Sequence, residues 1–168
     1  MSKSRFVREQ LASHHLVGMF NSGEQDIDSW LRDSALKASA RDYSRTYVWQ
    51  MHDNRIVAFF TLSTYSFSPD QLPKKWAHGE QRVVPAILLG KFALDLSLQG
   101  QGLSRLLIAD VVTEVEKASQ IAAARYLVVD ALSPEIIGLY ENFGFQRSLE
   151  SGAGNNRLFA RIKDLAKS

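Results

Sequence analysis

The sequence predicts a mixed α/β fold, with one domain over residues 1–168 and a strand, a glycine loop and a helix at its centre. A nearly continuous apolar stretch ends at Leu94, as in a central strand buried on both faces, and Gly90 within it indicates a bulge or a close backbone approach. The loop 99–102 follows, and apolar residues then recur at helical spacing over about residues 103–119. The two loop glycines either make a tight turn or leave the loop without side chains there. In the second case its backbone N–H groups can approach a phosphate at the helix N-terminus.

Composition narrows the classes of protein that the chain fits. Its 168 residues, 45% hydrophobic and 23% charged, suit one globular domain. We expect neither a membrane span nor a secretion signal, because no apolar run reaches roughly 18 residues and the first ten residues lack an apolar segment. Cysteine is absent, which excludes disulfides and thiolate metal sites, and the four histidines lack metal-ligand spacing. These features predict a cytoplasmic protein with no bound metal.

Before the central strand, the sequence predicts a helix, a hairpin and a loop. Apolar residues recur at three- and four-residue spacing over residues 27–38, and the pair Trp30-Leu31 is expected in the core. Residues 45–51 and 56–66 have strand character around a polar turn. Residues 68–81 hold two prolines and few apolar side chains, which favours a surface loop that can include a helical turn.

After the central helix, the sequence predicts one strand, one short helix and a hairpin. Residues 125–132 have the character of a buried strand. Ser133 is expected to cap the short helix at its start, and Gly144 is expected to end it. The last two strands are expected at residues 145–149 and 157–162, across a loop at residues 150–156.

This order of elements and two motifs resemble the Gcn5-related N-acetyltransferase family. In the central loop, Gln99 and Gly102 match the family pattern Arg/Gln-x-x-Gly-x-Gly/Ala, while Ser104 stands where glycine or alanine is usual. The segment Leu139–Phe145 matches the family's x-Tyr-x-x-x-Gly-Phe segment, with Tyr140 as its tyrosine. The resemblance favours the phosphate interpretation of the two loop glycines.

The first half of the chain resembles a narrower group, the acetyltransferase toxins of bacterial toxin–antitoxin systems. Residues 20–48 contain Phe-Asn-Ser-Gly, Trp-Leu and Arg-Thr-Tyr-Val as those toxins do, with Ser22 in place of the commoner cysteine. Residues 83–95 are similar to their Val-Pro-x-x-Leu-Leu-Gly-Arg-Leu-Ala-Val-Asp strand, with Lys91 in place of arginine. The resemblance covers about residues 20–145.

The resemblance implies a binding site for acetyl-coenzyme A. Backbone groups of Phe92, Ala93 and Leu94 would receive the pantetheine arm and the thioester oxygen. Backbone amides of the loop would hold the pyrophosphate. The loop residues are Gln99, Gly100, Gln101, Gly102, Leu103 and Ser104.

Tyr140 takes the place of the family's catalytic general acid. A phenol has a pKa of about 10, so it is protonated at neutral pH and can donate to the departing thiolate. Without the motif around it, the sequence favours a packed structural tyrosine. No general base stands out, since Asp95 and Asp130 fit local caps equally well. The α-amine of an aminoacyl-tRNA would have a pKa of about 8 or lower, because the neighbouring ester withdraws electrons. Much of that amine would already be neutral and would need no general base.

A set of basic residues could steer a polyanion, and the resemblance to the toxins implies that they form a tRNA-binding face, with an ordinary solvated surface as the alternative. These residues are Lys37, Arg41, Lys74, Lys75 and Arg82. The resemblance implies an aminoacyl-tRNA substrate and a homodimer. It also implies a ribbon-helix-helix antitoxin, through which the complex would bind operator DNA.

The predicted function is that of a toxin that acetylates the α-amino group of aminoacyl-tRNA and so inhibits translation. One alternative is an acetyltransferase of a small amine or a protein N-terminus, which would use the same loop and Tyr140. The other is a catalytically inactive binding module, which Ser104 in the loop favours.

Overall fold

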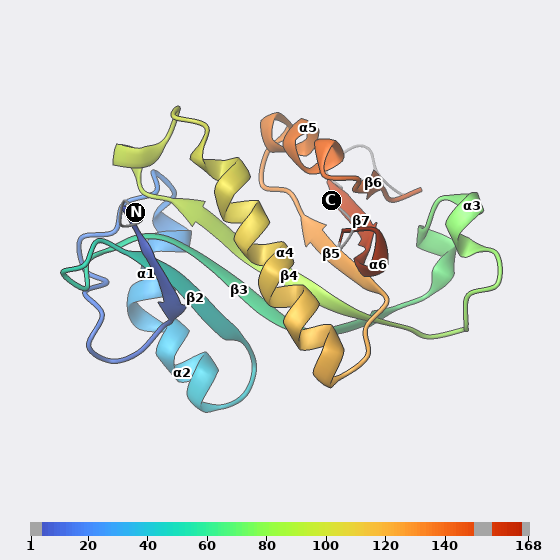
Figure 1. Ribbon diagram of the computed structural model, residues 1–168, viewed down its shortest axis with the longest axis horizontal. Coiled ribbons are helices and arrows are strands. Elements are labelled where there is room, and N and C mark those ends of the chain that lie inside the picture. The colour runs from blue at the N-terminus through green and yellow to red at the C-terminus, as the bar shows by residue number, and fades with distance from the viewer. Residues whose placement is uncertain (1–4, 150–155, 166–168) are drawn as a thin grey trace. The chain divides into compact units, whose positions relative to one another are not determined.

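The computed structural model describes residues 5–149 and 156–165 and has the predicted mixed α/β fold (Figure 1). Its strands hydrogen-bond in the order β1-β2-β3-β4-β5-β7-β6. The strands are β1 (Val7–Gln10), β2 (Arg45–Gln50), β3 (Ile56–Phe67), β4 (Val84–Leu94), β5 (Tyr126–Asp130), β6 (Gln146–Arg147) and β7 (Arg157–Arg161). The helices are α1 (Gln25–Asp33), α2 (Ala35–Ala40), α3 (Lys74–Ala77), α4 (Leu103–Ile121), α5 (Pro134–Asn142) and α6 (Ile162–Leu165), with short 3-10 turns η1 (Pro69–Gln71) and η2 (Leu96–Leu98). No helix among the described residues is both long and apolar enough to span a membrane.

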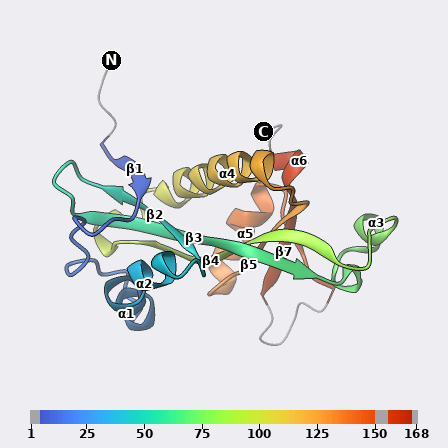
Figure 2. The same ribbon diagram turned by 90° about the horizontal axis from the view of Figure 1, so that it is seen from below.

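The chain forms two compact units, and β3, β4 and α4 each run from one unit into the other. The first unit comprises residues up to Ser63 together with Gly90–Ile108. In it, β1 pairs antiparallel with β2, and β2 with β3. Helices α1 and α2 lie on one face of these strands (Figure 2), because their apolar side chains complete a core with β2 and β3. That core contains Phe20, Ile27, Leu31, Ala35, Val48, Ile56, Phe59 and Ala93.

The second unit comprises Thr64–Leu89 and the described residues from Ala109 onward. In this unit, residues Ala86–Leu89 of β4 pair parallel with Tyr126–Val129 of β5. Strand β7 then pairs antiparallel with β5 on one side and with β6 on the other. Aromatic side chains fill the core of this unit: Phe67, Trp76, Tyr126 and Phe159.

Most predicted elements are confirmed, two predictions need correction, and one strand was not predicted. The helical pattern over residues 27–38 is two helices, because Ser34 leaves the helical region at φ −125°. Strand β1 was not predicted at all. Residues 68–81 are more than a surface loop, since Leu72 and Trp76 are buried in the aromatic core. The residues predicted to connect the last hairpin, 150–155, lie outside the described part of the chain.

Candidate functional site

The central loop has the backbone that the phosphate interpretation requires. Gly100 and Gly102 have φ of 78° and 75°, in the left-handed region that favours glycine. Among the described residues, no heavy atom outside their chain neighbours lies within 4 Å of a Cβ built on either glycine. The backbone here is therefore open to a group as large as a phosphate, directly before the N-terminus of α4.

Gln99 supports this loop through its side chain. Its Nε2 donates to the main-chain oxygens of Leu94 and Ser22, both at 2.9 Å. Its own backbone N–H donates to Leu96 O at 3.2 Å. Gln99 thus ties the start of the loop to the end of β4.

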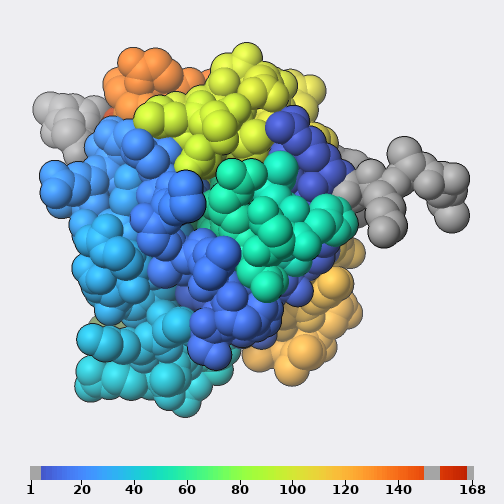
Figure 3. Space-filling view, turned by 90° about the vertical axis from the view of Figure 1, so that its left-hand side faces the viewer, coloured from blue at the N-terminus to red at the C-terminus, as the bar shows by residue number. Residues whose placement is uncertain are grey.

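The segment Asn21–Gly23 fastens the other side of the same loop region. Asn21 N–H donates to Asp95 Oδ1 at 2.9 Å, and Asn21 O accepts from Leu96 N–H at 2.8 Å. Ser22, which is buried, donates its hydroxyl to Asp28 at the start of α1 at 2.7 Å. In Figure 3 the yellow-green residues near this loop lie beside the blue N-terminal segment on one face of the first unit. These bonds connect Asn21 and Ser22 of the Phe-Asn-Ser-Gly motif to the residues before the glycine loop and to α1.

Strand β4 continues toward the loop beyond its residues in register with β5. The parallel register with β5 ends at Leu89, and β4 continues to Leu94. At the junction, Lys91 N–H donates to the hydroxyl of Thr61 on β3 at 2.8 Å. A Cβ on Gly90 would lie 3.0 Å from that hydroxyl, so the close backbone approach predicted at Gly90 is confirmed. The residues predicted to receive the thioester, 92–94, come directly after this junction.

Tyr140 lies on α5 in the second unit and is almost wholly buried, with 1% of its surface exposed. Its ring packs against Phe145 with centroids 5.3 Å apart. Burial raises the pKa of the Tyr140 phenol well above its usual value. The hydroxyl therefore stays protonated at every physiological pH, which is the state that a general acid requires.

Both acidic residues considered as a base accept hydrogen bonds within the fold. Burial acts to raise the pKa of Asp95, but hydrogen bonds from Asn21 N–H and from Ser97 outweigh it and lower that pKa. Asp130 accepts two hydrogen bonds from Arg157, at 2.7 and 2.9 Å. Both carboxylates thus have hydrogen-bond donors within the fold, which gives each a structural role.

The predicted tRNA-binding residues are exposed and fall on both units. Lys37 lies on α2 and Arg41 directly follows it, whereas Lys74 and Lys75 form the first turn of α3. Arg82 lies between α3 and β4. Helix α3 is anchored by buried Trp76, whose ring lies 6.0 Å from that of Tyr126 and under the guanidinium of Arg161.

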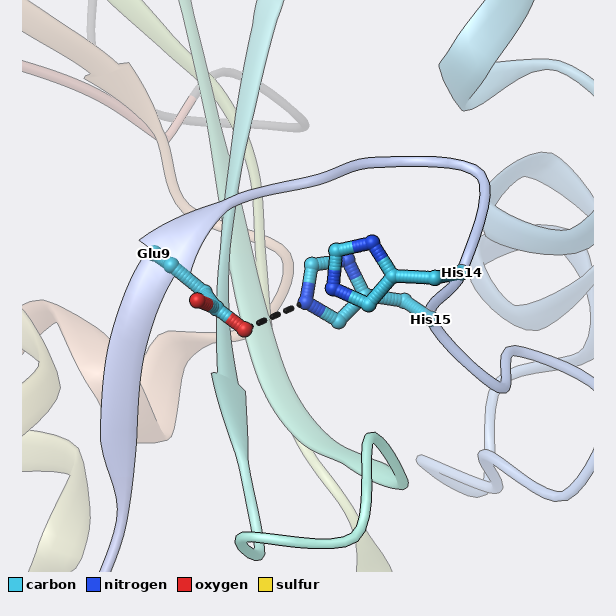
Figure 4. A group of neighbouring side chains, drawn as sticks. All are labelled: Glu9, His14 and His15. Carbon is cyan, nitrogen blue, oxygen red and sulfur yellow. Dashed lines mark hydrogen bonds and ion pairs between the residues drawn. The ribbon is translucent and has the colours of Figure 1, made fainter.

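Glu9, His14 and His15 are close enough together to be considered as metal ligands (Figure 4). Both ring nitrogens of His15 are already engaged, however. Its Nδ1 accepts from Ala12 N–H at 2.9 Å, so the proton lies on Nε2, which donates to Glu9 at 2.7 Å. A metal at Nε2 would have to displace that proton, and a proton moved to Nδ1 would break the hydrogen bond from Ala12 N–H. The arrangement fits a structural brace between β1 and the following loop, and we keep the prediction that no metal is bound.

The residues predicted for the site belong to both compact units. The first unit holds every predicted cofactor residue, Phe92–Leu94 and Gln99–Ser104, together with Lys37 and Arg41. The second unit holds Tyr140 with Lys74, Lys75 and Arg82.

The contribution of Thr61 was missed, because a buried threonine in a strand looks like any β-branched residue in the sequence.

Comparison with known proteins gives the following similarities. No protein-family model matches the chain. The chain is 33% identical, over 132 residues that make up 79% of each protein, to a tRNA-acetylating toxin of Mycobacterium tuberculosis. It is 25% identical to AtaT complexed with acetyl-methionyl-tRNAfMet, with a TM-score of 0.86 over 96% of this chain and 98% of that one. It is also 25% identical to AtaTR bound with acetyl-coenzyme A, with a TM-score of 0.82 over 97% of both chains.

Proposed function

The chain belongs to the family of the tRNA-acetylating toxins, and we propose that it transfers the acetyl group of acetyl-coenzyme A to the α-amino group of aminoacyl-tRNA. The acetylated α-amine can no longer attack the peptidyl ester, so the product cannot act as an acceptor in elongation and translation stops. The observation that carries the proposal is the glycine loop between β4 and α4, open at Gly100 and Gly102 and braced by Gln99. We further propose that residues 1–168 act as one acetyltransferase domain, because two strands and a helix run through both compact units.

The proposed mechanism uses backbone groups and one side chain. Acetyl-coenzyme A supplies the activated acetyl group. Backbone donors in the segment Phe92–Leu94 stabilise the oxyanion that develops when the amine attacks, and one such donor is typically worth ~3 kcal/mol. Tyr140 then gives its proton to the leaving sulfur. As the tetrahedral intermediate collapses, the C–S bond breaks and the amide remains on the amino acid.

The reaction as proposed needs no carboxylate base. The ester bond to tRNA withdraws electrons from the α-amine, whose reference pKa is already only ~8. A large fraction is therefore neutral at physiological pH, and water can remove the proton lost after attack. The commitment of Asp95 and Asp130 to hydrogen bonds within the fold supports this route.

The proposal extends to the partners. An exposed set of cations would contact the tRNA backbone: Lys37, Arg41, Lys74, Lys75 and Arg82. The protein would act in the cytoplasm as a homodimer. A ribbon-helix-helix antitoxin would neutralise it, and operator DNA would be bound through that complex.

The test is a cell-free translation assay with the wild type and the Tyr140→Phe variant, each with and without acetyl-coenzyme A. Charged tRNA is recovered and examined by mass spectrometry for an acetylated amino acid. The proposal expects inhibition that needs acetyl-coenzyme A, is lost in the variant and leaves acetyl-aminoacyl-tRNA. Unimpaired translation with unmodified tRNA would reject it. Assays on small amines and protein N-termini would then test the other acetyltransferase.

A further inference from the structure

We propose that Thr61 is a positioning residue for acetyl transfer, because its hydroxyl holds the backbone of β4 at Lys91, immediately before the segment Phe92–Leu94. The inference rests on the proposed function, in which that segment receives the thioester. In this role Thr61 contacts no reacting atom. It acts through the main chain of β4.

The N–H of Lys91 donates to a side chain of β3, the hydroxyl of Thr61. In a regular sheet, a strand N–H donates to a carbonyl of the neighbouring strand. At Lys91 the acceptor is a side-chain hydroxyl, 2.8 Å away, on a residue that is only 3% exposed. A side chain therefore helps to position β4 at this point, and a single substitution can remove its hydroxyl.

Gly90 leaves room for this hydrogen bond because it has no side chain. A Cβ at residue 90 would approach Thr61 Oγ1 to 3.0 Å, which is tighter than most real Cβ contacts, so the hydroxyl would have to move slightly. The absence of a side chain lets the threonine hydroxyl reach the next N–H along the strand. The β4–β5 register ends one residue earlier, at Leu89, so the hydroxyl fixes β4 just where the pairing with β5 stops.

The side chain of Lys91 is also held, which limits how far the strand can adjust. Its Nζ lies 5.1 Å from the ring centroid of Trp30 on α1. That ring in turn stacks on Phe59 of the core, with an angle of 10° between the planes. Loss of the Thr61 hydroxyl would leave the Lys91 N–H to find another partner while its side chain stays in place. The expected result is a small shift of residues 92–94.

A matched control lies opposite Thr61 in the same pair of strands. Thr46 on β2 is in register with Thr61 and is wholly buried. Within the described part of the chain, its hydroxyl has no hydrogen-bond partner. Thr46→Val and Thr61→Val thus make the same chemical change at neighbouring buried positions, and only the second removes a bond to β4.

The experiment compares the wild type with Thr61→Val, Thr61→Ser and Thr46→Val. It measures kcat and KM for acetyl-coenzyme A, the Kd for coenzyme A, the Tm and the amide exchange rate of Lys91. Thr61→Val should lower kcat roughly tenfold and speed Lys91 exchange, because small displacements of reacting groups are costly. Its Kd for coenzyme A should stay within about twofold, because the loop 99–104 carries that affinity. Thr61→Ser, which keeps the hydroxyl, and Thr46→Val should both resemble the wild type.

Three results would overturn the inference. One is a Thr61→Val variant whose kcat and Lys91 exchange match the wild type. The second is a loss that Thr46→Val shares, or that Thr61→Ser fails to restore, since both would indicate general damage to the sheet. The third is a wild type that binds coenzyme A but transfers no acetyl group, which rejects the proposed function as well. An active wild type beside an equally active Thr61→Val variant rejects the positioning role alone.

Discussion

Asp130 and Arg157 face each other across β5 and β7 and form a bidentate ion pair, with Nε and Nη2 of the guanidinium donating to the two carboxylate oxygens at 2.7 and 2.9 Å. The third guanidinium nitrogen, Nη1, donates to the hydroxyl of Tyr65. The bonds to Asp130 raise the pKa of Arg157, which therefore keeps its charge at all relevant pH values. The pair fastens the carboxyl end of β5 to β7.

Asp130→Asn should therefore affect stability and leave the chemistry largely intact. We expect a loss of roughly 1 kcal/mol in the free energy of unfolding, because the pair is partly exposed to solvent. The kcat should change by less than about threefold, whereas removal of a general base costs ~10²–10⁴-fold. Urea unfolding and acetyl-transfer kinetics measure the two effects. Glu141→Gln, which breaks the more exposed pair with Arg147, is the control. A kcat reduced a hundredfold or more would make Asp130 the base after all.

Tyr140→Phe should abolish most of the activity without unfolding the protein. The substitution keeps the ring that packs on Phe145 and removes only the proton donor. We expect kcat to fall by ~10²–10⁴-fold, with the Kd for acetyl-coenzyme A nearly unchanged. Tyr126→Phe is the matched control, since Tyr126 is equally buried in the same unit. Similar losses in the two variants would show that Tyr140 is structural.

The elements that the sequence predicts well are those with a strong local pattern. Strands β2, β3 and β4 and helix α4 each carry apolar residues at the spacing of their type, so tertiary contacts only reinforce the local preference. Strand β1 has the sequence Val-Arg-Glu-Gln and is largely half-exposed, so it shows no alternation. It forms because β2 offers it a register from Val7 opposite Gln50.

Only the site residues that belong to a sequence motif could be predicted. The motif locates the glycine loop and Tyr140, because those residue types recur for a chemical reason. It does not show that the Gln99 side chain bonds a carbonyl at Ser22, far away along the chain. It also does not show that Thr61 supplies an acceptor for β4, because that depends on how two strands approach each other. Likewise, the partners of Asp95 and Asp130 follow from tertiary pairing.

Stability should fall steeply with rising pH above about 10, and Tyr140 should contribute to the slope. The unfolded chain releases a phenol proton from about pH 10, whereas burial raises the pKa of Tyr140 in the folded state. Between those two pKa values the folded state holds more protons, so the free energy of unfolding falls by up to ~1.4 kcal/mol per pH unit for this group. Below pH 10 neither state has lost the proton, and Tyr140 adds no slope.

Urea unfolding between about pH 9 and about pH 11 measures this contribution. Tyr140→Phe should have a shallower decline than the wild type. Tyr43→Phe, at a tyrosine that is 69% exposed, should decline as the wild type does. Equal slopes in all three proteins would show that Tyr140 ionises as easily in the folded state as in the unfolded one.

Gln99→Leu should weaken the binding of acetyl-coenzyme A. Leucine has nearly the same size but cannot donate to Leu94 O and Ser22 O, so the start of the loop loses both attachments. We expect the Kd for coenzyme A to rise by roughly tenfold, since a lost hydrogen bond costs about 1 kcal/mol and the loop must be reordered on binding. Calorimetry measures the Kd. Gln120→Leu, on the exposed last turn of α4, is the control, and an equal Kd in the two variants would show that the loop needs no brace.

Charge reversal at α3 should weaken the use of tRNA while leaving acetyl-coenzyme A binding intact. Lys74 and Lys75 are exposed on a short helix whose position is fixed by buried Trp76, so their charges stand at a defined place on the surface. If they contact phosphates, the Lys74→Glu/Lys75→Glu variant should raise the KM for aminoacyl-tRNA and flatten its salt dependence by about one unit of log–log slope per lost contact. Initial rates across a salt series measure both. Lys117→Glu, on the exposed side of α4, supplies the control for a change in net charge alone. A salt slope that drops equally in the control would mean that overall charge steers the tRNA, and an unchanged slope in both would place the tRNA elsewhere on the surface.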